Sequence, residues 1–279
     1  MKYGEGLVVN KRRRKSDATL FPGHQLQEPV YNIKAGSTLV GQAFETATES
    51  LLGGDRRTTD GTADICPDAI DQGRKLWIEA KATQRQHAFK VVITQMECYD
   101  NAQYDAAVWS DYWRVLYCLW AYDEKRITKP RDWSTNCAPD VRRPTKEELI
   151  RLVLGATTHV HVLDISVLMR IRERCEHGAA PATCSVKDYA SWAGYHNGES
   201  YYVLNVGHKF LARLRGNVPF VLTELGLDPA KYRWRLHSCK PFKVTINSMD
   251  FSIPSVPAFE LLRPEEWIDH ADAKEIAPF

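Results

Sequence analysis

The sequence predicts a mixed α/β fold in its first half and a strand-rich region in its second half. Two observations carry this prediction. Helical and strand patterns alternate between residues 37 and 122, and most apolar runs after residue 200 are short and rich in β-branched or aromatic residues. The 279 residues have 44 % hydrophobic and 26 % charged side chains, which is typical of a globular protein. This composition excludes disordered, collagen-like and coiled-coil chains.

The first predicted helix covers residues 37–52. Ser37 opens it, apolar residues recur at helical spacing, and two glycines beginning at Gly53 end it. Two strand-like runs follow at 62–66 and 75–82. The connection between these runs is rich in turn-forming residues, which predicts an antiparallel hairpin.

The remaining elements follow from the same patterns. A helix is expected at 94–103, and the aromatic, β-branched run at 112–122 predicts a buried strand. A proline-containing loop at 128–145 is the best candidate boundary. Beyond this loop we expect helices at 146–154 and 165–174 and strands at 158–163, 201–206, 219–223, 232–237 and 242–246.

Simple features of the chain argue against a membrane-spanning protein and against a secreted protein. The longest uncharged apolar run, residues 115–122, is far shorter than the roughly 18–20 residues of a membrane span. The N-terminus has no apolar signal core. The seven cysteines are scattered without CxxC spacing, which indicates a reducing compartment rather than a disulfide framework.

Two basic segments could contact nucleic acid. The first is a run of five cations, Lys11, Arg12, Arg13, Arg14 and Lys15. This run is a solvated tail, a nuclear-targeting signal or an arm that neutralises phosphates. In the second segment, cationic and apolar residues alternate, namely Lys231, Arg233 and Arg235 with Tyr232, Trp234 and Leu236. This alternation predicts a half-buried strand with a cationic outer face.

A carboxylate and an ammonium group share one face of the predicted strand at 75–82. Because side chains alternate along a strand, Glu79 and Lys81 project together among apolar neighbours. Burying them is costly unless they pair with each other or bind a cation. Asp64, on the preceding strand, and the carbonyl of Ala80 add oxygen ligands of the kind that Mg²⁺ prefers, and Mn²⁺ can substitute. Lys81 would then assist the attacking water or stabilise charge on a phosphate.

These residues resemble the motif of the PD-(D/E)xK nuclease superfamily, which includes most type II restriction endonucleases. Asp64 is followed after fourteen residues by Glu79-Ala80-Lys81. The helix segment from Gly41 to Glu45 resembles the family helix whose glutamate reaches the metal site. Gln95 and Tyr99 resemble the Gln-x-x-x-Tyr helix of RecB-type exonucleases.

The resemblance implies a restriction-endonuclease-like core, a mixed central sheet flanked by helices, at 31–128. A basic arm and loop would precede it at 1–30, and an accessory DNA-recognition region would follow at 129–279. The implied activity is Mg²⁺-dependent hydrolysis of phosphodiester bonds in double-stranded DNA, of the sequence-specific restriction type. The catalytic set would be Asp64, Glu79, Lys81, Glu45 and Gln95, with the metal on Asp64, Glu79, Ala80 and Glu45.

The implied setting is the cytoplasm of a prokaryote or a phage-infected cell, with the basic run at 11–15 leaving nuclear import open. No membrane partner is expected. Cutting both strands of a duplex commonly takes two active sites, so a homodimer is one expected assembly. The two basic segments would then grip DNA phosphates.

Several alternatives stay open. Asp68 competes with Asp64 as the metal-binding aspartate, although it falls in the expected turn. Glu49 lies one helical turn after Glu45 and could replace it as the helix carboxylate. Tyr99 is expected mainly to pack its helix against the sheet. Zinc is not expected, because the histidine and cysteine spacings match no closed structural site. The alternative functions are a repair, recombination or phage-type nuclease directed by DNA ends or branches, and a non-catalytic DNA-binding protein on a nuclease-like fold.

Overall fold

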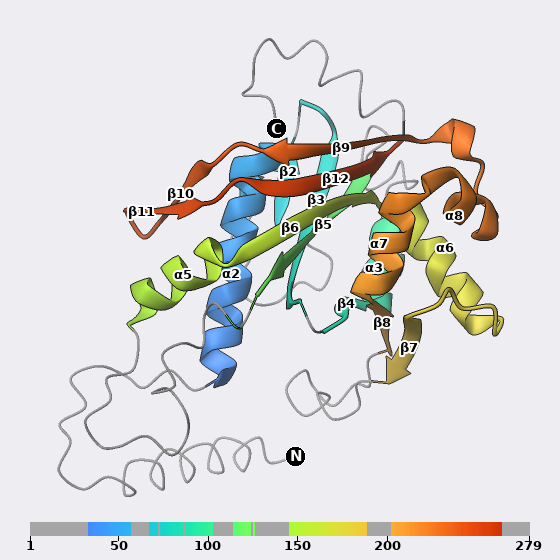
Figure 1. The fold of residues 1–279 in the computed structure, drawn as a ribbon, viewed down its shortest axis with the longest axis horizontal. Helices are drawn as coiled ribbons and strands as arrows, with labels where there is room; N and C mark the ends of the chain where they lie inside the picture. The colour runs from blue at the N-terminus through green and yellow to red at the C-terminus, as the bar shows by residue number, and fades with distance from the viewer. Residues whose placement is uncertain are drawn as a thin grey trace, which may run out of the picture.

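A seven-stranded sheet runs through the centre of the molecule (Figure 1). The computed structural model describes residues 33–56, 67–71, 73–85, 87–102, 114–123, 125, 145–188 and 202–263. In order across the sheet, the strands are β1 (Asp55–Arg56), β2 (Ala69–Asp71), β3 (Leu76–Gln84), β5 (Arg114–Tyr122), β6 (Thr157–Asp164), β12 (Val256–Leu262) and β9 (Arg233–Cys239). The pairs β3–β5 and β6–β12 are parallel, and the other neighbouring pairs are antiparallel.

Helices and two smaller strand groups surround this sheet. The helices are α2 (Ile33–Leu52), α3 (Ile93–Ala102), α5 (Lys146–Gly155), α6 (Ile165–Glu176), α7 (His208–Gly216) and α8 (Val218–Glu224), with a 3₁₀ turn, η3 (Pro229–Lys231). A three-stranded sheet has the order β4 (Phe89–Val92), β8 (Tyr202–Val206) and β7 (Cys184–Asp188), and a hairpin joins β10 (Phe242–Ile246) to β11 (Met249–Ile253). The predicted mixed α/β class, with a mixed central sheet flanked by helices, is confirmed.

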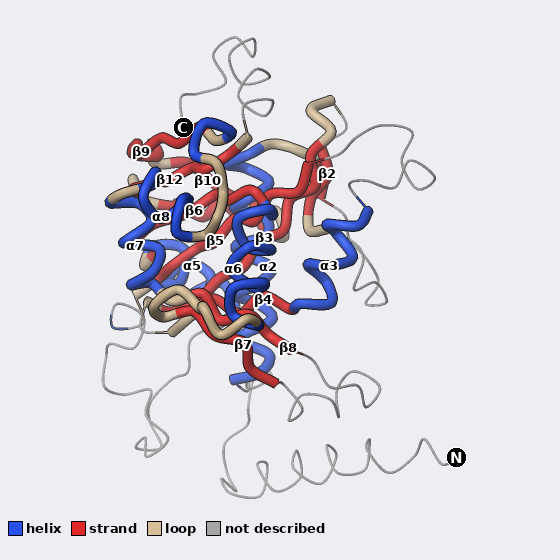
Figure 2. The backbone as a smooth tube through the Cα atoms, turned by 90° about the vertical axis from the view of Figure 1, so that its right-hand side faces the viewer, coloured by secondary structure: helices blue, strands red, loops and turns tan. Residues whose placement is uncertain are grey.

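Each face of the central sheet buries its own apolar core. On one face, α2, α5 and the β10–β11 hairpin cover a cluster that contains Phe44 and Trp120. On the other face, α3, α6, α7, α8 and the small sheet cover Tyr117, Phe210 and Phe259 (Figures 1 and 2). No helix in the described part of the chain is long and apolar enough to cross a membrane.

The elements with the clearest periodicity form where the sequence predicts them. Every helix and strand expected between residues 75 and 174 is present, with its ends shifted by at most two residues. Local chemistry explains two of the boundaries. Thr145 and Glu148 form a reciprocal capping box at the start of α5. The Asp164 side chain accepts a hydrogen bond from the Ser166 amide and begins α6 directly after β6.

Two expected strands are different in the structure. The described strand that pairs with β3 in the hairpin is β2, which lies in the expected connection, and residues 62–66 lie outside the described residues. The turn between them is shorter than expected because Arg74 donates from both its amide and its side chain to Asp71. The strand expected at 219–223 is wrong, because this run forms α8. Its apolar residues Val218, Val221 and Leu222 are buried at helical spacing.

The central sheet crosses the expected boundary at 128. Its strands β6, β12 and β9 come from residues after 145, and they continue the sheet that begins with β1, β2, β3 and β5. Helix α7, which the sequence patterns did not predict, also packs on this sheet, with Phe210, Leu211 and Leu214 buried. The second half of the chain therefore builds part of the same layered structure as the first half.

Candidate functional site

Three charged side chains meet where β2 and β3 pair. Glu79 of β3 is only 2 % exposed and forms an ion pair and hydrogen bond with Lys81 of the same strand. Asp68 immediately precedes β2, and its Oδ2 accepts a hydrogen bond from the Ala80 amide at 2.7 Å. The antiparallel register, with Ala69 opposite Ile78, brings Asp68 beside Glu79. Two carboxylates and one ammonium group thus share a mostly buried corner of the sheet.

The alternation along β3 explains why these groups lie together. Trp77, Glu79 and Lys81 share one face, and Trp77 is buried with its ring edge-on to Tyr99, at 5.7 Å between centroids. The side chain of Lys81 is 24 % exposed and that of Glu79 is 3 % exposed, and the ammonium group of Lys81 contacts the buried Glu79 carboxylate.

Helix α3 supports Glu79 from above the strand. The Tyr99 hydroxyl donates to Glu79 Oε2 at 3.0 Å, and Gln95 Nε2 donates to the Tyr99 hydroxyl oxygen at 3.1 Å. Tyr99 is fully buried, so it packs the helix as expected and also takes part in this hydrogen-bond chain. The helical spacing of four residues places Gln95 directly beside Tyr99.

Tyr117 is a buried neighbour of Glu79 that the sequence analysis missed. It lies directly opposite Glu79 in the parallel β3–β5 register. Its hydroxyl is buried and has no hydrogen-bond partner among the described residues. The sequence contains no signal for this neighbour, because the register between strands 38 residues apart along the chain is set by tertiary packing.

The site holds more negative than positive charge. Burial, followed by the charges of Glu79 and Glu45, raises the pKa of Asp68 to about 8 although Lys81 opposes the shift. Burial by itself would lower the pKa of Lys81, but the charges of Glu79 and Asp68 outweigh it and raise that pKa. Lys81 is therefore a permanent cation at neutral pH, and Asp68 holds a proton there.

The predicted site residues divide into three groups. Glu79, Lys81, Gln95 and the Ala80 amide come together as described above. Glu45 lies on α2, half-buried, and its charge acts on both Asp68 and Lys81. Asp64 and the basic run at 11–15 lie outside the described residues. In the described part of the chain, Asp68 is the aspartate that contacts the Glu79 strand. It does not fall inside the turn, because the turn itself begins only after β2.

The expected cationic strand has a different exposure pattern. Lys231 belongs to η3, and the strand begins at Arg233. Arg235 pairs with Glu260, which is buried directly opposite it on β12. The apolar side chains Trp234 and Leu236 are 42 % and 61 % exposed. The expectation of a half-buried strand with a cationic outer face is wrong, because the apolar side chains of this edge strand are exposed and Arg235 faces a carboxylate on the neighbouring strand.

The donor chemistry of the site fits a hard divalent cation. Carboxylate oxygens are the ligands that Mg²⁺ prefers, and the Asp68–Glu79 pair supplies them on neighbouring strands. In the metal-free protein, the proton on Asp68 offsets the surplus negative charge of the site. A bound cation would take the place of this proton and balance the same charge. No group of three or more histidine, cysteine, aspartate or glutamate side chains in the described residues is already arranged around one point.

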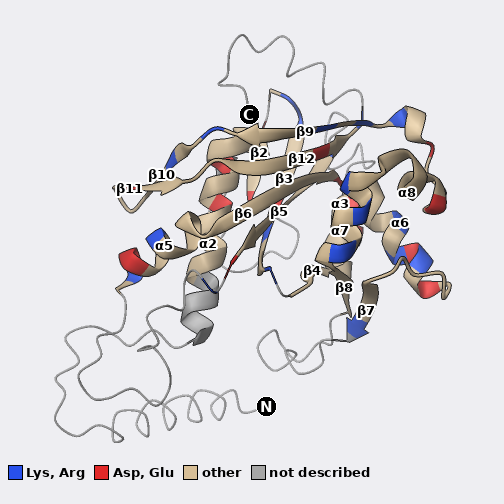
Figure 3. Ribbon diagram, viewed as in Figure 1, with Lys and Arg blue, Asp and Glu red and all other residues tan. Residues whose placement is uncertain are grey.

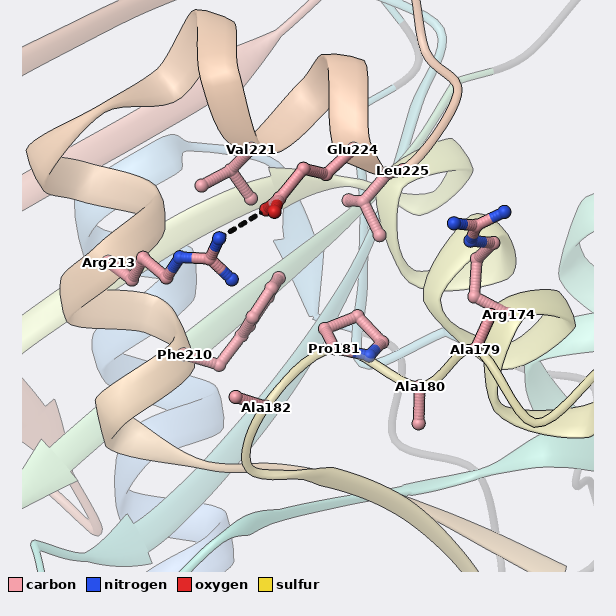
Figure 4. A pocket seen from close by; sticks show the side chains of 10 residues that line it. All are labelled: Arg174, Ala179, Ala180, Pro181, Ala182, Phe210, Arg213, Val221, Glu224 and Leu225. Atoms are coloured by element: carbon pink, nitrogen blue, oxygen red, sulfur yellow. Dashed lines mark hydrogen bonds and ion pairs between the residues drawn. The ribbon is translucent and has the colours of Figure 1, made fainter.

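A cavity of about 260 Å³ lies elsewhere, between α6, α7, α8 and the loop that follows α6. Phe210, Val221 and Leu225 give it apolar walls, and the Arg213–Glu224 ion pair lies at its side (Figure 4). None of the Asp68, Glu79 and Lys81 side chains lines it. The candidate site is therefore a polar cluster at a strand pair, separate from this cavity.

Replacing Tyr99 with phenylalanine is expected to weaken Mg²⁺ binding at the candidate site about tenfold, because Glu79 loses the donor that orients it. Calorimetric titration with Mg²⁺ measures this effect. Tyr117→Phe is the matched control, because its hydroxyl has no partner in the described residues and its removal should leave the titration unchanged. Equal Mg²⁺ curves for Tyr99→Phe and the unmodified protein would contradict the positioning role.

Comparison of the chain with protein-family models, with curated proteins and with solved structures finds no match in any of the three. The function of the chain is therefore inferred from its sequence motif and from the geometry of the site.

Proposed function

We propose that the chain is a Mg²⁺-dependent nuclease that hydrolyses phosphodiester bonds in double-stranded DNA. The observation that carries the proposal is the buried cluster in which Asp68, just before β2, lies beside Glu79 of β3, with Lys81 paired to Glu79. With Asp68 as the aspartate, the motif contains Pro67-Asp68, ten intervening residues and Glu79-Ala80-Lys81. The PD-(D/E)xK pattern then includes the proline that Asp64 lacks.

The metal would be held by Asp68, Glu79 and the carbonyl of Ala80, with Glu45 of α2 as a further carboxylate. A bound Mg²⁺ would supply Lewis-acid polarisation of the phosphate and a more acidic water. Tyr99 and Gln95 orient the Glu79 carboxylate by hydrogen bonding. Lys81 would stabilise negative charge that develops on the phosphate or position the attacking water.

A second candidate, an exonuclease directed by DNA ends, is favoured by one specific observation. The Gln95–Tyr99 pair, which resembles the helix motif of RecB-type exonucleases, is hydrogen-bonded to Glu79 and so belongs to the site. The restriction-type and end-directed nucleases share the same chemistry and differ in the DNA feature that they recognise.

Digestion of several DNA forms tests these functions. The purified full chain is incubated in Mg²⁺ with unmethylated plasmid, phage DNA, linear duplex and a branched junction. We expect discrete, reproducible fragments from plasmid and phage DNA and no cleavage with excess EDTA. Progressive loss of linear DNA with intact circles would favour the end-directed nuclease, and cutting of the junction alone would favour a junction enzyme. Retarded but uncut DNA on every substrate would overturn the assignment as an enzyme.

A further inference from the structure

Three histidines gather on the same face of the central sheet as Glu79 and Lys81. His159 and His161 lie on β6, and His208 is the first residue of α7. The centroid of the His159 ring is 5.1 Å from that of His161 and 5.6 Å from that of His208. His161 lies opposite Leu119, and Leu119 lies opposite Lys81. The histidine cluster is therefore two strand spacings, about 10 Å, from the candidate catalytic cluster.

The histidine cluster contains buried ring nitrogens with no hydrogen-bond partner. His161 is 1 % exposed, and neither of its ring nitrogens has a partner among the described residues. The same holds for His208 Nδ1, while His208 Nε2 donates to the Gln84 carbonyl at 3.3 Å. His159 Nδ1, by contrast, is hydrogen-bonded to Thr158 Oγ1 at 3.0 Å. An unpaired buried nitrogen carries a desolvation cost, so the cluster contains polar atoms that no described group satisfies.

The charged groups that act most strongly on the histidine cluster are cationic. Arg85 and Arg215 both act electrostatically on His159, and neither forms an ion pair within the described part of the chain. Burial, followed by the charges of His208, Arg215 and Arg85, lowers the pKa of His159 to about 4. Burial and cationic neighbours lower the pKa values of His161 and His208 as well. None of the charged groups that shift these three pKa values is a carboxylate.

Helix α7 adds positive charge near the histidine cluster. Its cationic residues are visible in Figure 3, and Arg215 lies two turns after His208, on the same side of the helix. The N-terminal end of α7 adds a partial positive charge beside His208. The cluster thus resembles an anion site that has no anion of its own among the described side chains.

We propose that His159, His208, Arg85 and Arg215 bind a phosphate group, namely a backbone phosphate of the DNA strand that flanks the phosphate at Glu79 and Lys81. The identification of the phosphate as a DNA phosphodiester rests on the proposed nuclease function. Guanidinium groups suit phosphate oxygens because they donate in a planar fork. A transition metal is the other ligand that neutral imidazoles take, but two nearby guanidinium groups repel it.

Binding of inorganic phosphate to the metal-free full chain tests the site directly. Histidine ring resonances are followed by NMR over a pH titration, with and without saturating phosphate. We expect phosphate to raise the titration midpoint of His159 by about one pH unit, because an anion stabilises the imidazolium. An unchanged His159 midpoint in phosphate would overturn the proposal. Stoichiometric Zn²⁺ binding by the three histidines, with no response to phosphate, would also overturn it and assign a metal site.

The salt dependence of DNA binding tests the same residues on the proposed substrate. It is measured in Ca²⁺, which is expected to support little cleavage because its coordination is looser than that of Mg²⁺, so that binding is measured separately from catalysis. Arg85→Gln and Arg215→Gln should each reduce the slope of log affinity against log salt by about 0.9, the value for one lost phosphate contact. Arg213→Gln is the matched control on α7, because Arg213 is paired with Glu224 (Figure 4) and should not change the slope.

The outcomes separate the two proposals. If the protein cuts DNA but the slopes of Arg85→Gln and Arg215→Gln equal that of Arg213→Gln, the phosphate site is wrong and the nuclease stands. If no DNA is cut in Mg²⁺ but both variants lower the slope, the phosphate site stands on a DNA-binding protein without nuclease activity.

Discussion

Replacement of Lys81 by methionine is expected to slow DNA cleavage about 10²–10³-fold, the usual cost of losing one preorganised group that stabilises transition-state charge. Lys81 is paired with Glu79 and remains cationic at neutral pH, so methionine removes the charge while keeping the length of the side chain. DNA affinity should change little, because a single site cation is one of many phosphate contacts. Single-turnover cleavage of supercoiled plasmid in Mg²⁺ and equilibrium binding in Ca²⁺ measure the two quantities.

The controls for this prediction address folding and general loss of charge. Lys187→Met removes an exposed lysine of β7, outside the central sheet, and should leave cleavage unchanged. Because Lys81→Met leaves Glu79 buried without its ion pair, circular dichroism must first show that the variant is folded. Glu79→Gln provides a second test, since its amide oxygen still offers Lys81 an acceptor. Cleavage by folded Glu79→Gln or Lys81→Met at the rate of the unmodified protein would refute the site.

In EDTA, the protein is expected to become less stable as the pH rises from about 5 to about 8, and Asp68→Asn is expected to flatten this dependence. The pKa of Asp68 is raised from 3.8 to about 8 in the folded protein, so the folded state holds a proton that the unfolded state has released. Over this window the free energy of unfolding therefore falls with rising pH, by at most about 1.4 kcal/mol per pH unit from this group. Urea denaturation at several pH values measures the slope.

Asp71 supplies the matched control, because its pKa is shifted in the opposite direction. Burial by itself would raise this pKa, but the hydrogen bonds and charge of Arg74 outweigh burial and lower it. Its contribution to stability is present above its unfolded pKa and is lost only in acid, so Asp71→Asn should destabilise the protein without changing the slope between pH 5 and 8.

Mg²⁺ gives this prediction a second readout. At pH 8, near the raised pKa of Asp68, a large fraction of this carboxyl group is ionised, and added Mg²⁺ should raise the melting temperature of the unmodified protein, since a ligand that binds only the folded state stabilises it. The rise should be much smaller for Asp68→Asn. An equal pH slope in EDTA for Asp68→Asn and the unmodified protein would show that Asp68 is not the buried acid of this cluster.

The sequence alone determines those features that depend on local periodicity. The alternation along β3 puts Glu79 and Lys81 on one face, and helical spacing places Gln95 beside Tyr99. Strong periodicity also determines the existence of α3, β5, β6 and α6, because neighbouring residues along the chain decide each of these elements.

The tertiary structure decides which distant segments of the chain pair with one another. Within the described residues, the antiparallel β2–β3 register brings Asp68 beside Glu79, and the parallel β3–β5 register brings Tyr117 beside Glu79. Strand pairing also decides the environment of Arg235, which forms an ion pair with Glu260 on the neighbouring strand. Residues that lie far apart in sequence are brought into contact by packing and register, and neither the hydrophobic period nor local propensity carries information about which strands become neighbours.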